Sequence, residues 1–356
     1  MNRQRLQFIV FLALLIVVVM VVSGVGAAPK DDLRVSLSAA QTSYSASQDV
    51  LVTVTISNPN KNSVRILKWF TPADGVEEPL FNLQRDGEPV SYTGAIYKRP
   101  AATGNDYITL KAGESITNIV SLGDYYDLSG TGEYEISYAV ASYNLFNEKG
   151  NGSKYQDSLA SDPISLSVEG RAAKGKPAPP PPPPSGGNSF DACTATQQTA
   201  LIAARGAAKT YASESKSYLS GISSSTPRYG VWFGTFTNPR FTAVSAHFTA
   251  LSSAWDTASV TFHCGCKKNY YAYVYPNQPY NIYLCKVFWL APLKGTDSKG
   301  GTLIHEMSHF YVVASTDDYV YGQTGAMNLA ISNPDNAIMN ADNHEYFAEN
   351  TPPLNP

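Results

Sequence analysis

Two histidines and a glutamate stand within five positions in the segment GGTLIHEMSHF, residues 300–310. Residues four apart on an α-helix lie on one face, so His305 and His309 can direct both imidazoles at one ion. Glu306 lies beside them and can reach a water on that ion. The arrangement suits zinc, which takes nitrogen ligands at about 2.0–2.1 Å and keeps one position open for water. The alternative, two surface or packing histidines on a helix, is disfavoured because the apolar flanks predict a buried helix, where unpaired imidazoles and a carboxylate are costly.

A third protein ligand must follow these histidines. Val312 and Ser315 occupy the positions where a metzincin needs glycine and histidine, which excludes that class. A thermolysin-like site would take Glu345 or Glu349 from a later helix. A nearer candidate is Asp318, which a turn can bring back to the ion.

The motif HEMSH followed by STDDYVYG, residues 315–322, resembles the signature of the aspzincin, or deuterolysin-like, metallopeptidases. Ser315 replaces the first glycine of the family, at a turn position that is not a ligand. The resemblance implies that Asp318 is the third ligand of one zinc ion in the catalytic domain. It also implies that Tyr321 donates a hydrogen bond or proton to the reacting oxyanion. With Glu306 as general base, this predicts peptide hydrolysis by zinc-activated water, without a covalent intermediate.

The end of the chain is acidic. No lysine or arginine follows Lys299, whereas Asp and Glu recur throughout this stretch, and the excess predicts a pocket for a cationic group. The segment MNADNHEYFAEN, residues 339–350, closely resembles the peptidyl-Lys metalloendopeptidases, a subgroup of the aspzincins. The resemblance implies that Asp342 and Glu345 bind the substrate lysine on the carboxyl side of the cut bond. Two converging carboxylates suit an ammonium with three donors. The match gives His344 no role.

An α+β domain of the zincin type, residues 189–356, is expected to position these residues. Alanine-rich and helix-compatible patterns predict helices, and tyrosine-rich and β-branched runs predict strands. The predicted helices are 194–219, 239–255 and the segment around residue 305, and the predicted strands are 258–264, 270–276 and 281–290. The resemblance implies that AYVYP, residues 272–276, is the edge strand along which extended substrate pairs.

The chain has four cysteines, all in this domain. Cys264 and Cys266 are too close in sequence to pair readily with each other, and three connectivities are possible. The family resemblance implies the disulfides Cys193–Cys264 and Cys266–Cys285. A structural zinc site built from four cysteines is a poor alternative in the exported protein that the N-terminal segment, residues 1–28, predicts.

Residues 29–170 alternate at period two and predict an all-β immunoglobulin-like sandwich without a catalytic constellation. The proline- and glycine-rich stretch 171–188 predicts a linker, with a proline-rich binding motif as the alternative. Residues 1–28 combine a positive flank, an apolar run and small residues, which predicts a secretory signal peptide. An uncleaved membrane anchor is the alternative.

The upstream region is expected to be a pro-region that inhibits the enzyme or assists its folding, with a permanent accessory module as the alternative. Lys174 and Lys176 would suit self-processing. A net charge of −3 with 15% charged residues argues against a nucleic-acid partner, and membrane contact is expected only through the signal segment. The sequence predicts a secreted zinc endopeptidase that cuts before lysine in proteins and peptides. A broader deuterolysin-like protease and an inactive zincin-containing surface binding protein remain alternatives.

Overall fold

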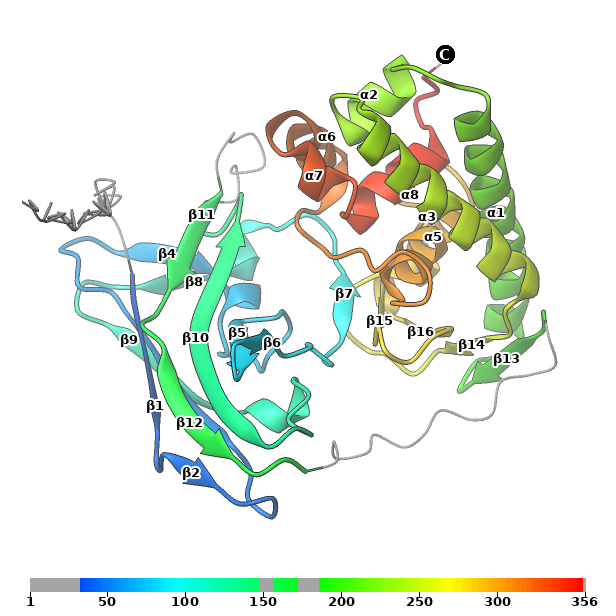
Figure 1. The fold of residues 1–356 in the computed structure, drawn as a ribbon. Helices are drawn as coiled ribbons and strands as arrows, with labels where there is room; N and C mark the ends of the chain where they lie inside the picture. Colours follow the sequence, from blue (N-terminus) through cyan, green and yellow to red (C-terminus); the bar gives the residue numbers. More distant parts are fainter. Residues whose placement is uncertain (1–32, 148–155, 172–185, 355–356) are drawn as a thin grey trace, which may run out of the picture.

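The computed structural model describes residues 33–147, 156–171 and 186–354. The predicted signal peptide, Lys174, Lys176 and most of the predicted linker lie outside these residues. Among the described residues, no helix is both long and apolar enough to cross a membrane. Figure 1 shows a β-rich half and a mixed α/β half, which meet at strand β7.

The first half is built from strands and three short 3-10 helices. Its strands are β1 (Arg34–Ala39), β2 (Ser43–Tyr44), β3 (Leu51–Ser57), β4 (Val64–Leu67), β5 (Phe81–Arg85), β6 (Glu88–Pro89), β7 (Ile96–Lys98), β8 (Tyr107–Leu110), β9 (Ser115–Ser121), β10 (Gly132–Ser142), β11 (Asp157–Ala160) and β12 (Ile164–Val168). The 3-10 helices are η1 (Lys68–Phe70), η2 (Gly104–Asp106) and η3 (Leu122–Asp124).

Alternation of apolar and polar residues explains this half. In β3 the side chains of Val52, Val54 and Ile56 are buried while their neighbours are not, which is the pattern of a strand with one face against a core. Sheets β1-β3-β9 and β2-β12-β10-β5-β6 contribute to a common apolar core. The prediction of a β-rich region is confirmed, and its assignment as immunoglobulin-like stays a prediction.

The second half contains helices and a short sheet. Its strands are β13 (Asn188–Asp191), β14 (Val260–His263), β15 (Ala272–Val274) and β16 (Asn281–Leu284), and its helices are α1 (Ala195–Ser220), α2 (Pro227–Phe233), α3 (Asn238–Thr257), α4 (Lys286–Leu290), α5 (Lys299–His309), α6 (Gly322–Ser332), α7 (Pro334–Ala337) and α8 (Ala341–Glu349). Threonine side chains cap the N-termini of α1 and α3, as the local sequences favour. The predicted mixed α/β architecture is therefore confirmed.

The strand predicted for residues 281–290 is wrong in its second part. Strand β16 ends at Leu284, and α4 begins at Lys286. Cys285 lies between them and is bonded to Cys266, while the amides of Lys286 and Val287 hydrogen-bond to a neighbouring loop. These amides belong to the first turn of α4, where a helix has no acceptors of its own, so the loop satisfies them at the point where the helix begins.

Both disulfides implied by the family resemblance are present. Cys193–Cys264 joins the chain before α1 to the end of β14, and Cys266–Cys285 closes a loop that contains β15 and β16.

One sheet contains strands from both halves, in the order β13-β14-β16-β15-β7. Within the second half, β15 pairs with β16 on one side only. Its other side pairs antiparallel with β7, with Ala272 opposite Lys98 and Val274 opposite Ile96. The strand predicted to receive substrate is thus the edge of the α/β half, and a segment of the β-rich half is added to it (Figure 1).

Candidate metal centre and lysine pocket

Helix α5 carries His305, Glu306 and His309 into the core. The Ser298 side chain caps the helix by accepting a hydrogen bond from the Gly301 amide. The side chains of all three residues are fully buried. The helix packs against α1 and α8 and is buried along nearly its whole length, which places the motif inside the α/β half.

Two glycines allow α5 to approach its neighbours closely. A Cβ at Gly301 would lie 2.0 Å from Glu349 Oε1, and one at Gly300 would lie 2.8 Å from the Ala207 Cβ. The Glu349 carboxylate accepts hydrogen bonds from the amides of Asp297 and Ser298 and from the Ser298 hydroxyl. This end of α8 is therefore attached to the start of the metal-motif helix.

A tight turn after α5 returns the chain to the same site. Ser315 has a φ of 52°, in the left-handed region that glycine adopts most easily. His309 Nδ1 donates a hydrogen bond to the Thr316 carbonyl at 2.9 Å, which leaves Nε2 to face the site. The Asp317 amide bonds to the Met339 carbonyl. The turn thereby delivers Asp318 to the two imidazoles.

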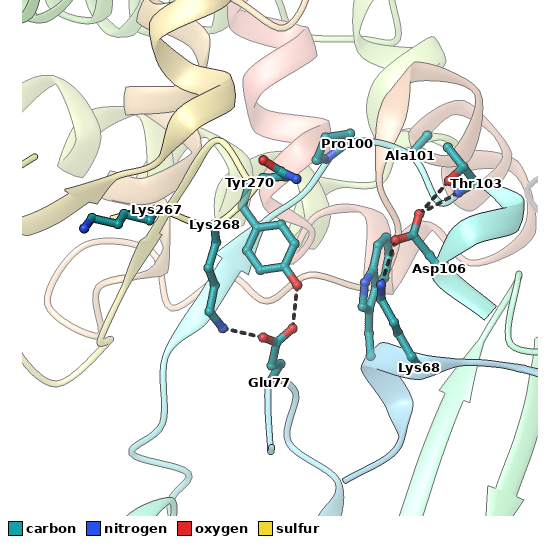
Figure 2. A pocket seen from close by; sticks show the side chains of 11 residues that line it. Lys68, Glu77, Pro100, Ala101, Thr103, Asp106, Lys267, Lys268 and Tyr270 are labelled. Atoms are coloured by element: carbon teal, nitrogen blue, oxygen red, sulfur yellow. Dashed lines mark hydrogen bonds and ion pairs between the residues drawn. The ribbon is translucent and has the colours of Figure 1, made fainter. Parts of the chain in front are cut away.

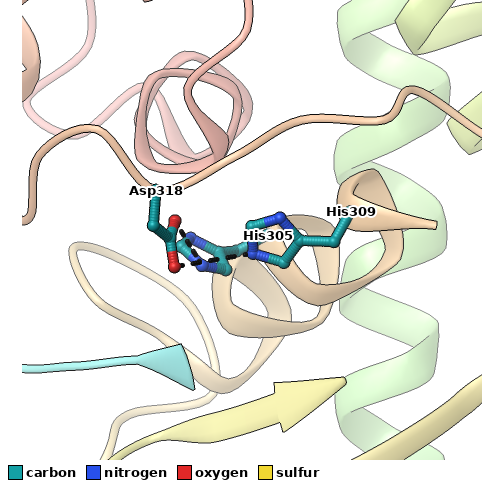
Figure 3. A group of neighbouring side chains, drawn as sticks. All are labelled: His305, His309 and Asp318. Carbon is teal, nitrogen blue, oxygen red and sulfur yellow. Dashed lines mark ion pairs between the residues drawn. The ribbon is translucent and has the colours of Figure 1, made fainter. Parts of the chain in front are cut away.

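His305, His309 and Asp318 form a compact buried cluster (Figure 3). His305 Nε2 lies 3.2 Å from Asp318 Oδ1, and His309 Nε2 lies 3.6 Å from Asp318 Oδ2. Both Nε2 atoms and both carboxylate oxygens are buried without a hydrogen bond of acceptable geometry. Burial acts against the charge, but the two imidazoles hold the pKa of Asp318 below its usual range. A cation bound by two nitrogens and one oxygen fits this donor set, which is one that zinc accepts.

Glu306 lies on the same helix and has no assigned partner among the described residues. Its two carboxylate oxygens are buried and make no hydrogen bond. Burial raises the pKa of Glu306 well above its usual range. A carboxylate with this tendency to take up a proton suits a general base.

Asp342 and Glu345 come from the first turns of α8, and their spacing of three puts them on one face. Both are fully buried. Asp342 Oδ1 lies 2.8 Å from His305 Nδ1, and Asp342 Oδ2 accepts a hydrogen bond from the Gly322 amide at 2.6 Å. Asp342 therefore contacts the metal-motif histidine directly, as carboxylates behind metal-binding histidines commonly do. Sequence reasoning did not identify this second contact.

The carboxylate pair holds an ammonium group in the structure. Lys98 Nζ lies 2.5 Å from Glu345 Oε2 and 3.1 Å from Asp342 Oδ1, with Asp297 Oδ1 at 3.8 Å. Only 1% of the Lys98 side chain is exposed. Despite burial, Asp342, Glu345 and Asp297 raise the pKa of Lys98 well above its usual range, so the pocket holds a charged ammonium. The structure thus adds Asp297 to the two carboxylates named from the sequence.

Tyr321 is the residue just before α6, and it lies close to strand β7. Its hydroxyl donates to the Tyr97 carbonyl oxygen at 2.9 Å and accepts from Arg99 Nη1 at 2.9 Å. The Trp69 ring packs edge-on against the Tyr321 ring. This geometry places the Tyr321 hydroxyl at a peptide carbonyl, where a hydrogen bond to a developing negative charge is possible.

His344 lies in α8 between Asp342 and Glu345, but its ring hydrogen-bonds to other groups. Its Nδ1 donates to the Asn340 carbonyl, and its Nε2 accepts from His247 Nδ1 at 3.0 Å. Burial lowers the pKa of His247 to about 4 and that of His344 to about 3. The two rings are therefore neutral packing groups of the core.

Comparison with known proteins identifies the family to which this chain is similar. Residues 218–349 match the aspzincin family model, described as lysine-specific metallo-endopeptidase. An extracellular protease of Aeromonas hydrophila is 43% identical over 87% of this chain and 90% of its own length. A peptidyl-Lys metalloendopeptidase of Armillaria mellea is 36% identical over 92% of this chain and 94% of its own length. A peptidyl-Lys metalloendopeptidase of Pleurotus ostreatus is 53% identical over 47% of this chain and 99% of its own length.

The similarity to the first two relatives extends over most of both chains, and the family match covers the metal cluster and the carboxylate pair. The predicted resemblance is confirmed. The chain belongs to the aspzincin family of lysine-specific metallo-endopeptidases.

Proposed function

We propose that this metalloendopeptidase hydrolyses peptide bonds on the N-terminal side of lysine, with zinc held by His305, His309 and Asp318. The observation that carries the proposal is the position of the lysine pocket. Asp342 contacts His305, a member of the proposed ligand set, on the nitrogen that faces away from Asp318. A lysine whose side chain occupies this pocket therefore has its backbone next to the three proposed zinc ligands.

Zinc, when bound, supplies a Lewis acid that activates water and polarises the carbonyl of the bond to be cut. Glu306 accepts the proton of the attacking water and returns it to the departing amine. The Tyr321 hydroxyl donates a hydrogen bond to the carbonyl oxygen as its negative charge grows. Asp342 and Glu345 hold the lysine ammonium, and strand β15 orients the substrate backbone by antiparallel pairing.

The same reasoning extends to the chain outside the α/β half. We infer that residues 1–28 are a secretory signal peptide and that the enzyme is secreted. Two disulfides in the described residues and an extracellular relative support this inference. We also infer that residues 29–170 form an immunoglobulin-like pro-region, joined through the linker 171–188 to the catalytic domain 189–356, so that the enzyme is made as a precursor.

Cleavage-site profiling of a denatured protein mixture tests the specificity. The expected result is that nearly all new N-termini begin with lysine, and that Glu306→Gln and removal of metal by a chelator abolish them. New N-termini spread over many residue types would point to a broader protease. No chelator-sensitive cleavage at all would contradict the enzymatic role of this site.

A further inference from the structure

We propose that β7 is a substrate-like strand that blocks the active site of the precursor, and that Tyr97–Lys98 is the bond the enzyme cuts within its own chain. This inference rests on the proposed function. It identifies the segment of the β-rich half that occupies the active site, and it names one peptide bond in that segment.

The backbone of β7 lies on β15 in the manner of an extended substrate. The two strands are antiparallel, with Tyr97 opposite Tyr273 and Lys98 opposite Ala272. The Tyr271 amide donates to the Lys98 carbonyl at 3.0 Å. β15 is the edge of the catalytic sheet, so this pairing uses the same backbone groups that a bound peptide would need.

The side chain of Lys98 fills the lysine pocket. Its ammonium contacts Glu345 and Asp342 at 2.5 and 3.1 Å, and it lies 5.0 Å from the centre of the Tyr271 ring. A buried lysine at this position is costly unless its charge is compensated, and the catalytic half supplies all three nearby carboxylates. No other lysine can enter the pocket while this one occupies it.

The position of the preceding carbonyl identifies the bond. Tyr97 supplies the carbonyl that accepts the hydrogen bond from the Tyr321 hydroxyl at 2.9 Å. In a protease that cuts before lysine, this carbonyl belongs to the bond that is broken. Hydrolysis adds water oxygen to the Tyr97 carbonyl carbon and breaks its bond to the Lys98 nitrogen, which takes up a proton. The products are a Tyr97 carboxylate and a Lys98 amine.

Arg99, the residue after Lys98, is bound by the segment Glu77–Glu78, which precedes the bond in the chain. The Arg99 guanidinium is buried, pairs with Glu78, and donates to the Glu77 carbonyl at 3.0 Å. Glu77 in turn binds two catalytic-half side chains, Lys268 and Tyr270, at the edge of a cavity of about 440 Å³ (Figure 2). Glu77 and Glu78 precede the bond, so these contacts tie the new amine end, through Arg99, to the segment that ends in the new carboxylate, and they attach that segment to the catalytic half.

Two further contacts lie on opposite sides of the bond, because Tyr92 precedes it and Tyr143 follows it. The Tyr311 hydroxyl donates to the Tyr92 carbonyl at 3.0 Å, and the Tyr143 and Ser332 hydroxyls lie 2.9 Å apart. Both pairs join the β-rich half to the catalytic half. Because both product ends stay attached, cleavage of this bond alone releases them slowly, and the strand acts as an inhibitor even though its bond can be cut.

The test uses the full-length secreted chain, freshly purified with its metal. Initial rates on a peptide with a single lysine are compared for the wild type, Lys98→Met and Lys111→Met. Methionine keeps the length of the side chain but removes the ammonium, and Lys111 is an exposed control in the same half. Loss of one partner of a buried ion pair weakens the hold of the strand by about a hundred-fold. We expect Lys98→Met to start at least about ten-fold faster than the other two chains.

A second readout needs no pocket variant. Incubation of the wild-type chain should yield a fragment whose N-terminus is Lys98, identified by mass and terminal sequencing. The fragment should be absent from Lys98→Met and from Glu306→Gln. Equal initial rates for the three chains would overturn the block. A wild-type chain that cuts added peptide while Tyr97–Lys98 stays intact would overturn the assignment of the bond.

Failure of the proposed function gives a different pattern, because no chain would then cut added lysine peptides at any time. Binding of a fluorescent lysine peptide to inactive Glu306→Gln provides a separate measurement in that case. Addition of Lys98→Met to this variant should strengthen binding at least about ten-fold. Unchanged binding would overturn the occupied-pocket inference irrespective of catalysis.

Discussion

Replacement of Glu345 by glutamine separates lysine recognition from catalysis. Lys98 occupies the position that we propose for the substrate ammonium, 2.5 Å from Glu345 Oε2 and 3.1 Å from Asp342 Oδ1. Glutamine keeps the volume and one acceptor oxygen but removes one of the two closest negative charges. The metal cluster is left with all of its donor atoms.

The size of the effect follows from the burial of the pair. A hydrogen bond to a charged group contributes about 1.5–3 kcal/mol, and loss of one partner of a buried ion pair costs about 3–5 kcal/mol. Because Asp342 keeps its charge in this variant, we take the lost stabilisation of the lysine ammonium as about 3 kcal/mol, the low end of the range for a buried ion pair. This corresponds to a loss of about a hundred-fold in kcat/KM for lysine peptides. Norleucine peptides, which carry no ammonium, should change little.

The assay compares kcat/KM for matched peptides that differ only in lysine or norleucine after the cut bond, with fully processed enzyme. Zinc content is measured in parallel and should stay at one ion per catalytic domain. A preference for lysine over norleucine that stays within about three-fold of the wild-type value would refute the assigned role of Glu345, because about 0.6 kcal/mol is too small for a buried ion pair.

Asp342→Asn is the informative comparison. It removes the same charge from the pocket, but Asp342 Oδ1 lies 2.8 Å from His305 Nδ1, against 3.4 Å for Glu345 Oε2, and Asp342 also accepts a hydrogen bond from the Gly322 amide at 2.6 Å. The asparagine variant should therefore lose lysine preference and also bind zinc about 10–100-fold more weakly, as expected when the partner of a metal-binding histidine is changed. Equal zinc affinities for the two variants would contradict this difference between the carboxylates.

Three further predictions concern the metal cluster and its surroundings. Asp318→Asn should abolish turnover and leave less than stoichiometric zinc after dialysis, measured by elemental analysis; full zinc content would exclude Asp318 as a ligand. Tyr321→Phe should lower kcat by about 10²–10³-fold with a nearly unchanged KM, because it removes one donor to the oxyanion, and a change in KM alone would assign the hydroxyl to binding. The pKa of His247 falls from 6.5 to about 4 in the folded protein, so the unfolded chain binds the proton first and stability is lost as the pH drops from 6.5 towards 4. Between pH 8 and 4.5 this amounts to roughly 2.5 kcal/mol, which His247→Gln should remove from the pH dependence of urea unfolding, and parallel curves for both proteins would contradict it.

The sequence predicts those parts of the fold and site that local patterns determine. Period-two alternation identifies strands such as β3 and β10, and a spacing of four brings His305 and His309 to one face of α5. The turn chemistry around Ser315 lies within the same short segment, so Asp318 is also accessible to local reasoning. Residues 286–290 could not be assigned in this way, because the acceptors for the first amides of α4 lie in a loop elsewhere in the sequence.

Lys98 escapes prediction for a different reason. In the segment IYKRP it reads as a charged residue of a short exposed strand, and nothing near it in the sequence signals burial. Its partner Asp342 lies 244 positions away, and the pairing of β7 with β15 joins the two halves of the chain. Such a contact depends on the packing of both halves, which periodicity and motif spacing do not encode.

The Cys266–Cys285 disulfide has a consequence for the enzyme after β7 has left. It closes a loop with a sequence separation of 19 that contains β15, and closure of a loop of this size restricts the unfolded chain by about 3 kcal/mol. The strand that we propose to bind substrate is thereby restricted before binding, so less conformational entropy is lost when a peptide pairs with it. Mild reduction of this bond should therefore weaken peptide affinity before it disturbs the helix that bears the histidines.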